Sequence, residues 1–221
     1  TFDILNEMFI RSKFHFGIAD ERELAGKMID AVAQDVYYKD EPQIWIFDRG
    51  FPSLSLIQKL LEHRLYFVMR VSSSFLKEVN AFRKSKYVDR VIHIEYSERR
   101  ATQNHVHSDG ISQFDLRCVR VKLPSGEDEI LVTNLDRKDF PKRDIKEIYR
   151  LRWGIETGFN YLKNAVFVEE FVSKTENGLA QDYFVSLLVY NFATCICGSM
   201  YPNIPKKENT STRSIEELPP D

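Results

Sequence analysis

The sequence predicts an α/β protein with a mixed sheet flanked by helices, and three patterns support this fold class. Short apolar runs alternate with amphipathic helical patterns over residues 1–71. Residues 72–140 contain alternating and β-rich runs instead, which indicates an antiparallel β-rich insertion. Two long helical patterns, at about 143–165 and 178–199, then precede a polar end.

The first two elements are a strand and a capped helix. Residues 1–11 are expected to form a strand, although their apolar alternation is imperfect. Asp20 and Glu23 have the spacing of a capping box, in which two side chains bond the free backbone groups at a helix start. A helix is therefore expected after Asp20, with its apolar residues facing inward. These residues are Leu24, Met28, Ile29, Val32 and Val36.

A strand, a helix and a second strand follow. The apolar run at 43–48 is typical of a buried strand. Gly50 permits a turn, and Ser53 can cap a helix over about 53–63. Residues 66–71 form the next apolar run. This order of elements predicts a sheet that contains parallel strands.

The middle of the chain predicts antiparallel strands, joined in one place by a hairpin turn at Pro124–Gly126. The strand-like runs are at 91–96, 114–123 and 129–133. We therefore divide the chain into a core of residues 1–71 and 141–200, an insertion of residues 72–140, and a flexible polar tail of residues 201–221.

Charge is distributed unevenly along the chain. Hydrophobic residues make up 43% and charged residues 29%, and the net charge of −2 does not by itself indicate a nucleic-acid-binding protein. Local basic patches, however, decide contacts with phosphate. Two clusters stand out, of which the second could equally be a solubilising surface. The first contains Lys142, Arg143, Lys146, Arg150, Arg152 and Lys163, and the second Lys77, Arg83, Lys84, Lys86 and Arg90.

The cysteines argue against a disulfide-rich protein, and the longest uncharged segment argues against a membrane-spanning one. Three cysteines cannot form a disulfide framework, so buried thiols in a reducing cytoplasm are expected. Residues 183–200 carry no charge but include polar side chains, which favours a buried core helix over a membrane span. His105 and His107 could share a strand face and bind a metal, although an ordinary surface strand is the preferred interpretation.

Four polar residues share one face of a predicted helix. Tyr149, Arg152, Glu156 and Lys163 stand at offsets of 0, 3, 7 and 14, which places them within about 60° around a helix axis. Such residues often form a solvated face, where ion pairs contribute only a few tenths of a kcal/mol. A carboxylate held beside two cations and a phenol on a rigid element would also suit a metal-bound phosphate.

A second polar motif follows the strand at 43–48. Asp48 ends that strand at the turn Asp48-Arg49-Gly50-Phe51, a common position for a metal-binding carboxylate. Asp48 could equally be a turn residue whose side chain bonds its own backbone.

Together these motifs resemble a known family. The pattern Y-x2-R-x3-E-x6-K, with Trp153 directly after the Arg, resembles the signature of bacterial insertion-sequence DDE transposases of the Y-R-E-K branch. Asp48-Arg49-Gly50-Phe51 looks like the motif around the family's second catalytic Asp, and the two motifs occur in the expected order. The resemblance implies an RNase H-like core with a β-rich insertion between that Asp and the Glu.

The resemblance also implies an activity and a set of site residues. Asp48 and Glu156 would be catalytic residues that hold two Mg²⁺ or Mn²⁺ ions for DNA cleavage and strand transfer. Tyr149 and Arg152 would contact a phosphate, Lys163 would neutralise the DNA backbone and Arg49 would help to position the strand. Trp153 would pack in the core, which we favour, or stack on a displaced base.

Partners and location follow from the same resemblance. The implied partners are transposon-end DNA, target DNA and a second copy of the chain in a homodimeric synaptic complex. A bacterial cytoplasmic protein near the nucleoid, without a membrane association, is expected.

One element of the family pattern is missing. In the family that the motifs resemble, the first catalytic Asp precedes the strand where this chain begins, and Asp3 is not expected to replace it, because residues 2–5 look like the following strand. We therefore expect an amino-terminally truncated fragment that is inactive alone. Two other interpretations stay open: an RNase H-like nuclease that cuts without joining strands, and a decayed transposase that only binds DNA.

Overall fold

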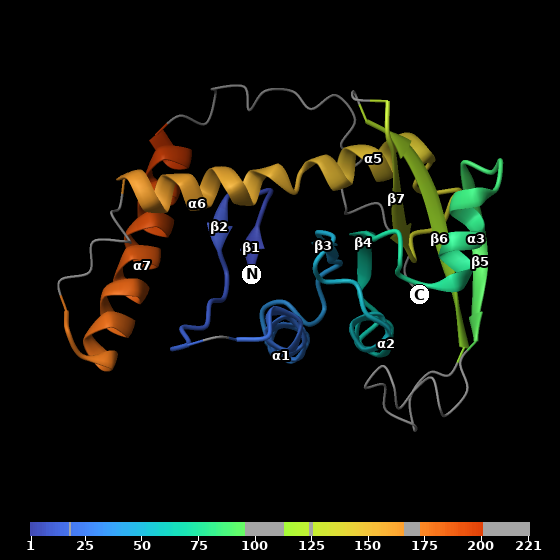
Figure 1. The fold of residues 1–221 in the computed structure, drawn as a ribbon. Coiled ribbons are helices and arrows are strands. Elements are labelled where there is room, and N and C mark those ends of the chain that lie inside the picture. Colours follow the sequence, from blue (N-terminus) through green and yellow to red (C-terminus); the bar gives the residue numbers. More distant parts are fainter. Residues whose placement is uncertain (18, 96–112, 124–125, 166–172, 201–221) are drawn as a thin grey trace. The chain divides into compact units, whose positions relative to one another are not determined.

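The fold is described by a computed structural model for residues 1–17, 19–95, 113–123, 126–165 and 173–200 (Figure 1). The chain divides into two compact units. We call the described part of Asp20–Arg150 the sheet unit. The helical unit combines the described residues of Thr1–Ala19 with those from Leu151 onward. His105, His107 and the tail at 201–221 lie outside the described residues.

The sheet unit is built on a five-stranded mixed sheet. Its strand order is β3-β4-β7-β6-β5, in which β3 and β4 are parallel and the other neighbours antiparallel. The strands are β3 (Ile44–Phe47), β4 (Tyr66–Arg70), β5 (Asp89–Glu95), β6 (Gln113–Lys122) and β7 (Asp128–Thr133). This arrangement confirms the predicted mixed α/β class and is consistent with an RNase H-like core.

The strands of the expected insertion join the same sheet as β3 and β4. β7 pairs with β4, with Met69 opposite Val132, so the hydrogen-bonded ladder continues from the core into the segment 72–140. The division of the chain into core and insertion stays a prediction. Between β6 and β7, the backbone N–H of Gly126 donates to the carbonyl oxygen of Leu123. Gly126 has a positive φ of 86°, a conformation that glycine adopts readily.

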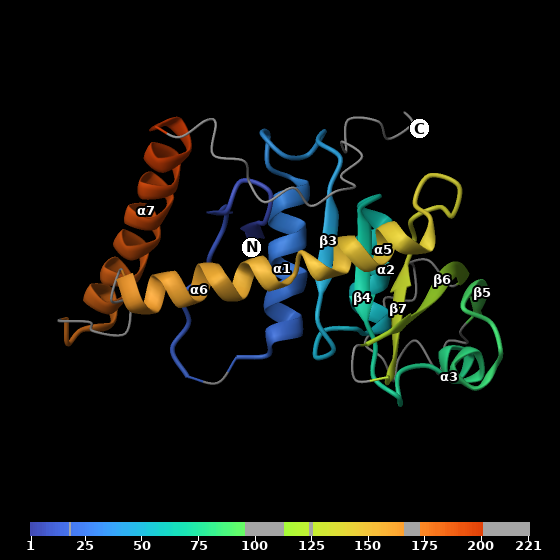
Figure 2. The same ribbon diagram turned by 90° about the horizontal axis from the view of Figure 1, so that it is seen from above.

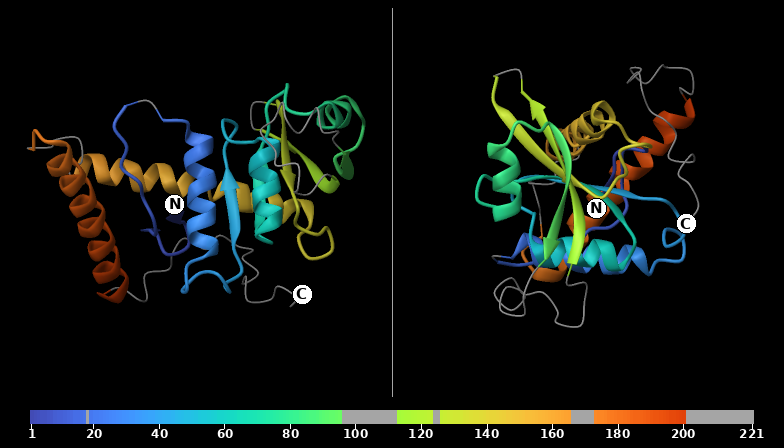
Figure 3. Two further views of the ribbon diagram at one scale, coloured as in Figure 1. Left: turned by 90° about the horizontal axis from the view of Figure 1, so that it is seen from below. Right: turned by 90° about the vertical axis from the view of Figure 1, so that its right-hand side faces the viewer.

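Helices cover both faces of this sheet. Successive side chains of a strand point to opposite faces, so alternate residues of β4 pack against different helices. On one face, Phe67 and Met69 of β4 pack with residues of α1 (Glu21–Ala33), α2 (Leu54–Glu62) and α3 (Lys77–Lys84). On the other face, Val68 packs under α5 (Lys142–Arg150) (Figures 1 and 2). The side view in Figure 3 places the sheet between these layers. The result is a three-layer unit with two separate cores.

The helix caps follow the sequence closely. The Asp20 carboxylate accepts the backbone N–H groups of Arg22 and Glu23, at 2.8 and 3.4 Å. Ser53 Oγ accepts the backbone N–H of Leu56 at 3.2 Å and begins α2 as predicted. The inward position of Val36 is wrong, because α1 ends at Ala33 and Val36 is 71% exposed. Helix α3 was not predicted.

Cys118 lies in the larger core, on β6, and is fully buried. Burial raises the pKa of the Cys118 thiol to about 12, so the reactive thiolate is absent at ordinary pH. Cys195 and Cys197 are exposed, so the prediction of buried thiols is wrong for these two.

We therefore expect a thiol reagent at mildly alkaline pH to modify Cys195 and Cys197 in the native protein and to spare Cys118 until denaturant is added. Reagent uptake counted by mass spectrometry, before and after unfolding, measures this. Modification of Cys118 at the rate of the other two would contradict its burial.

The helical unit opens with a hairpin, and the prediction of one strand over residues 1–11 is wrong. Strands β1 (Phe2–Asp3) and β2 (Met8–Phe9) are antiparallel. The Asp3 carboxylate accepts the backbone N–H groups of Leu5 and Asn6, at 2.9 and 3.1 Å, and so stabilises the chain reversal. These local hydrogen bonds favour a turn more strongly than the weak apolar alternation favours one continuous strand.

The single helix expected over 143–165 is also wrong, since a turn at Leu151–Arg152 separates α5 from α6 (Trp153–Ala165). The backbone N–H of Gly154 donates to Leu151 only three residues back, at 2.8 Å. A Cβ atom on Gly154 would lie 3.0 Å from the Ile4 side chain, so the glycine permits close packing of α6 on the hairpin.

The last helix, α7 (Glu176–Met200), buries only one side. Leu187 and Tyr190 pack with Phe9 and Leu162, whereas Leu188 is 67% exposed. The prediction of a buried helix at 183–200 is therefore correct for one face only. In the described part of the chain, no helix combines the length and apolar character that crossing a membrane requires.

Candidate active site

Asp48 lies at the end of the sheet where the carboxyl ends of β3 and β4 and the start of β7 bring polar side chains together. It follows β3, and Arg70 ends β4, so the parallel pairing of these strands places both residues at one edge. Because β7 runs antiparallel to β4, its first residues, including Glu129, lie at the same edge. A polar cluster of Asp48, Arg70 and Glu129 results.

The Asp48 carboxylate is held by several groups at once. Its Oδ1 atom accepts the backbone N–H of Arg49 at 2.7 Å and the hydroxyl of Tyr149 at 3.0 Å. Arg70 Nη1 lies 3.9 Å from the same oxygen. The side chain is still 43% exposed. Asp48 is thus both a turn residue, whose side chain accepts the backbone N–H of the next residue, and a carboxylate that solvent can reach.

Arg70 and Glu129 were missed by the sequence analysis. Arg70 Nε lies 3.0 Å from Glu129 Oε1, and the Glu129 side chain is only 12% exposed. Arg70 is therefore an ordered cation between two carboxylates, those of Asp48 and Glu129. Its position could have been inferred from the sequence. Arg70 ends the strand that follows Asp48, and the carboxyl ends of neighbouring parallel strands lie side by side.

Tyr149 reaches Asp48 from α5. Its ring packs partly buried against the second core, beside Ile148, and its hydroxyl donates to Asp48. The two residues are 101 positions apart, and each comes from a different motif. The phosphate contact implied for Tyr149 stays a prediction.

Glu156 and Arg152 form a second polar group, in the helical unit. Arg152 Nη1 lies 2.8 Å from Glu156 Oε1, and their side chains are 15% and 42% exposed. The Arg152 guanidinium lies over the Trp153 ring, 5.1 Å from its centroid. Trp153 itself is 62% exposed, so its favoured packing in the core is wrong, whereas stacking on a base stays a prediction.

Two further cations of the prediction are exposed. Lys163 stands two turns after Glu156 on α6, so the two side chains leave the same side of the helix. Arg49 is exposed at the turn after Asp48. Asp48 and Glu156 belong to different units, and the convergence of their carboxylates stays a prediction.

The donor chemistry of these residues suits a hard divalent cation. Carboxylate oxygens are the ligands that Mg²⁺ prefers, and it needs few of them because it keeps several waters. Asp48 and Glu156 each present an accessible carboxylate. Among the described residues, no three His, Cys, Asp or Glu side chains gather as a metal site.

Comparison with known proteins decides the family. Residues 1–192 match the family model described as a transposase DDE domain. The chain belongs to this DDE transposase family. The resemblance drawn from its two motifs is therefore confirmed at the level of the family.

Several transposases are similar to this DDE transposase chain over most of its length. A putative transposase of Sinorhizobium fredii is 26% identical over 66% of the chain and 40% of its own length. A probable transposase for the insertion sequence element IS5377 of Geobacillus stearothermophilus is 22% identical over 78% and 43%. A putative transposase for the element IS4SA of Synechocystis is 22% identical over 80% and 46%. The chain thus spans less than half the length of these relatives.

Proposed function

We propose that Asp48 and Glu156 are metal-binding carboxylates of an active site that cuts transposon-end DNA and joins it to target DNA. The observation that carries this proposal is the hydrogen bond from Tyr149, of the Y-R-E-K motif, to Asp48, of the second motif. Two motifs that lie far apart in the sequence share one polar cluster, and a solvated helix face would not require such a contact.

The catalytic role of the carboxylates follows from their chemistry. Bound Mg²⁺ or Mn²⁺ would activate the attacking water or 3′-hydroxyl and stabilise the leaving oxygen. Asp48 is suited to hold such an ion, because the Arg49 backbone and Tyr149 fix its carboxylate while leaving it accessible. Arg152 fixes Glu156 in the same way, through one arm of its guanidinium.

DNA binding is proposed for the cations and aromatic groups near these carboxylates. Arg152, Lys163 and Arg49 would contact phosphates of the transposon end, and exposed Trp153 would stack on a base. Two such chains would form a homodimer that holds both ends of the element with the target.

A cleavage assay tests this function. The full-length protein from the reading frame that encodes this chain is incubated with labelled DNA carrying the terminal repeats of its element. We expect nicking at the repeat ends with Mg²⁺ or Mn²⁺, loss of nicking with a chelator, and joined products when target DNA is added. Cutting without joining would favour a simple nuclease. Binding without cutting would favour a decayed transposase.

Tyr149→Phe tests how Asp48 is positioned. Loss of a hydrogen bond to a charged group costs about 1.5–3 kcal/mol, which corresponds to a cleavage rate lower by about 10- to 100-fold. Because Tyr149 bonds a proposed metal ligand, the half-saturating Mg²⁺ concentration for cleavage should also rise. An unchanged Mg²⁺ dependence combined with weaker DNA binding would assign Tyr149 to the phosphate alone.

A further inference from the structure

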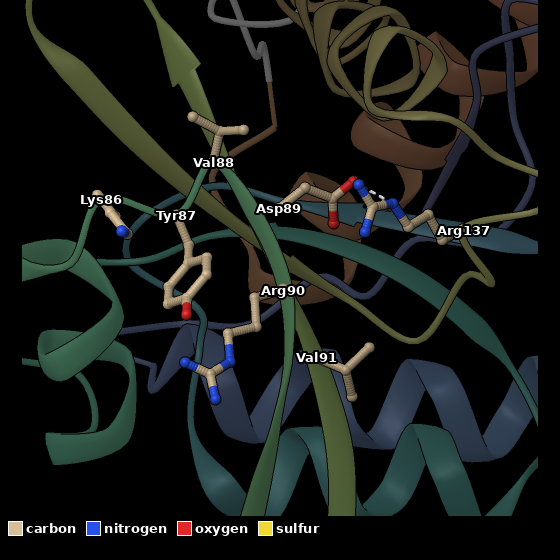
Figure 4. A pocket seen from close by; sticks show the side chains of 7 residues that line it. All are labelled: Lys86, Tyr87, Val88, Asp89, Arg90, Val91 and Arg137. Atoms are coloured by element: carbon tan, nitrogen blue, oxygen red, sulfur yellow. Dashed lines mark ion pairs between the residues drawn. The ribbon is translucent and has the colours of Figure 1, made fainter.

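Within the sheet unit, the outer edge of the sheet carries a second polar surface, at the opposite side of the sheet from Asp48. Among the described residues, β5 is the last strand of the sheet, and none of them forms a strand that pairs with its outer side. An open cavity of about 620 Å³ lies along its start and is lined by Lys86, Tyr87, Val88, Asp89, Arg90, Val91 and Arg137 (Figure 4). We call this surface the β5 edge.

Cations flank the strand on both sides. Figure 4 places Lys86 and Arg90 on one side and Arg137 on the other, beside Asp89. Within the described part of the chain, no carboxylate lies within ion-pairing distance of Lys86 or Arg90. Arg137 Nε lies 3.5 Å from Asp89 Oδ2, but the Arg137 side chain is 68% exposed.

Asp89, the carboxylate among the described residues that line the β5 edge, is already paired with another cation. Arg117 binds both oxygens of Asp89, at 3.0 and 2.9 Å, and the Arg117 and Asp89 side chains are 2% and 4% exposed. Asp89 is therefore a buried structural partner of Arg117. The charge of Asp89 is already balanced by Arg117, so Arg137 adds a positive charge to the surface. The β5 edge therefore carries a net positive charge.

The Tyr87 ring restricts the orientation of one of these cations, Arg90. The Arg90 guanidinium lies over the Tyr87 ring, 4.7 Å from its centroid, and Tyr87 is 45% exposed. Stacking restricts the guanidinium while its in-plane N–H donors stay available, which suits contact with phosphate oxygens. A surface that only keeps the protein soluble needs no such restriction.

Protection of an edge strand is the simplest other explanation. Charged side chains on an edge prevent pairing with another sheet, and Arg90 could serve that purpose alone. It does not account for Arg137, which comes from a loop after β7, or for the aromatic ring under Arg90.

We propose that the β5 edge binds the phosphodiester backbone of duplex DNA, at a place distinct from the cluster of Asp48, Arg70 and Glu129. The identity of the ligand rests on the proposed function, whereas the binding surface rests on Lys86, Arg90, Arg137 and Tyr87. Contacts of this kind carry no base specificity, so they would hold DNA flanking the reacting end or target DNA.

Salt dependence of DNA binding tests this proposal. The 221-residue protein is titrated onto a fluorescent duplex without terminal repeats, and anisotropy is measured from about 50 to 200 mM salt. The variant Lys86→Gln/Arg90→Gln/Arg137→Gln should lower the slope of log K against log [salt] by about 2–3 and the affinity at low salt by about tenfold or more.

A control variant separates this surface from net charge. Lys27→Gln/Lys39→Gln/Lys122→Gln removes the same charge from exposed positions outside the β5 edge, and we expect its slope to remain near that of the parent. Circular dichroism and thermal melting check that both variants fold.

Three outcomes would overturn the proposal. They are equal slopes for the two variants, no binding of the duplex by the parent protein, and binding of an acidic polypeptide such as polyglutamate in preference to DNA. The assay involves no cleavage, so its failure would leave the carboxylate site, tested by cutting at transposon ends, unaffected.

Discussion

Glu156→Gln in the full-length protein is expected to abolish cleavage at transposon ends while binding to those ends persists. The amide keeps the size of the side chain and still offers an oxygen to Arg152, 2.8 Å away in the native protein, but it loses the charge that a metal ion requires. Metal ions supply several kcal/mol of charge stabilisation, so the rate should fall by about a thousandfold or more.

Glu147→Gln is a matched control for this variant. Glu147 lies on α5 and pairs with Arg150 at 3.0 Å, outside the carboxylate pair of the proposed site, so cleavage should stay near normal. Labelled ends resolved on a denaturing gel measure cutting, and anisotropy measures binding. Near-normal cleavage by Glu156→Gln would remove Glu156 from the active site, and Asp48→Asn offers the same test for the second carboxylate.

Arg117→Met is expected to destabilise the sheet unit by about 3–5 kcal/mol. Arg117 binds Asp89 with two hydrogen bonds, and its Nη1 atom donates to the carbonyl groups of Leu135, Asp136 and Phe140 at 3.2, 3.2 and 2.7 Å. The substitution removes the bidentate partner of a buried carboxylate, for which Arg137 remains as an ion-pair partner among the described residues, and it leaves these carbonyl groups without their donor.

Urea unfolding followed by circular dichroism measures this effect. Arg143→Met, at a side chain that is 75% exposed, is the control and should change stability by no more than about 0.5 kcal/mol. Adding Asp89→Leu to Arg117→Met should cost less than the sum of the single changes, because the unpaired buried charge is removed. Additive losses would mean that Arg117 acts mainly through the carbonyl groups.

The Arg117 network also connects the fold to the site. Its three carbonyl partners belong to the segment between β7 and α5, and α5 carries Tyr149. By fixing that segment, Arg117 fixes where α5 begins over the sheet. We therefore expect the stability of this buried ion pair to influence how firmly Tyr149 holds Asp48.

Local patterns predicted much of the sheet unit correctly. The strand before Asp48, the helix capped by Ser53 and the strands β6 and β7 follow from apolar runs, capping residues and turn glycines, whose effects act over a few residues. The same reasoning failed where a short-range bond competes with a weak pattern. The Asp3 turn divided an expected strand, and the turn at Leu151–Arg152 divided an expected helix.

The sequence by itself determined the family, the fold class and the identity of Asp48, Tyr149, Arg152 and Glu156 as candidate residues, because their spacing and strand-end or helical positions are local properties. Only the tertiary structure placed the Tyr149 hydroxyl on Asp48 and Arg70 between Asp48 and Glu129. These contacts depend on strand order and on which face α5 covers, and both are set by packing between segments that are distant in the chain.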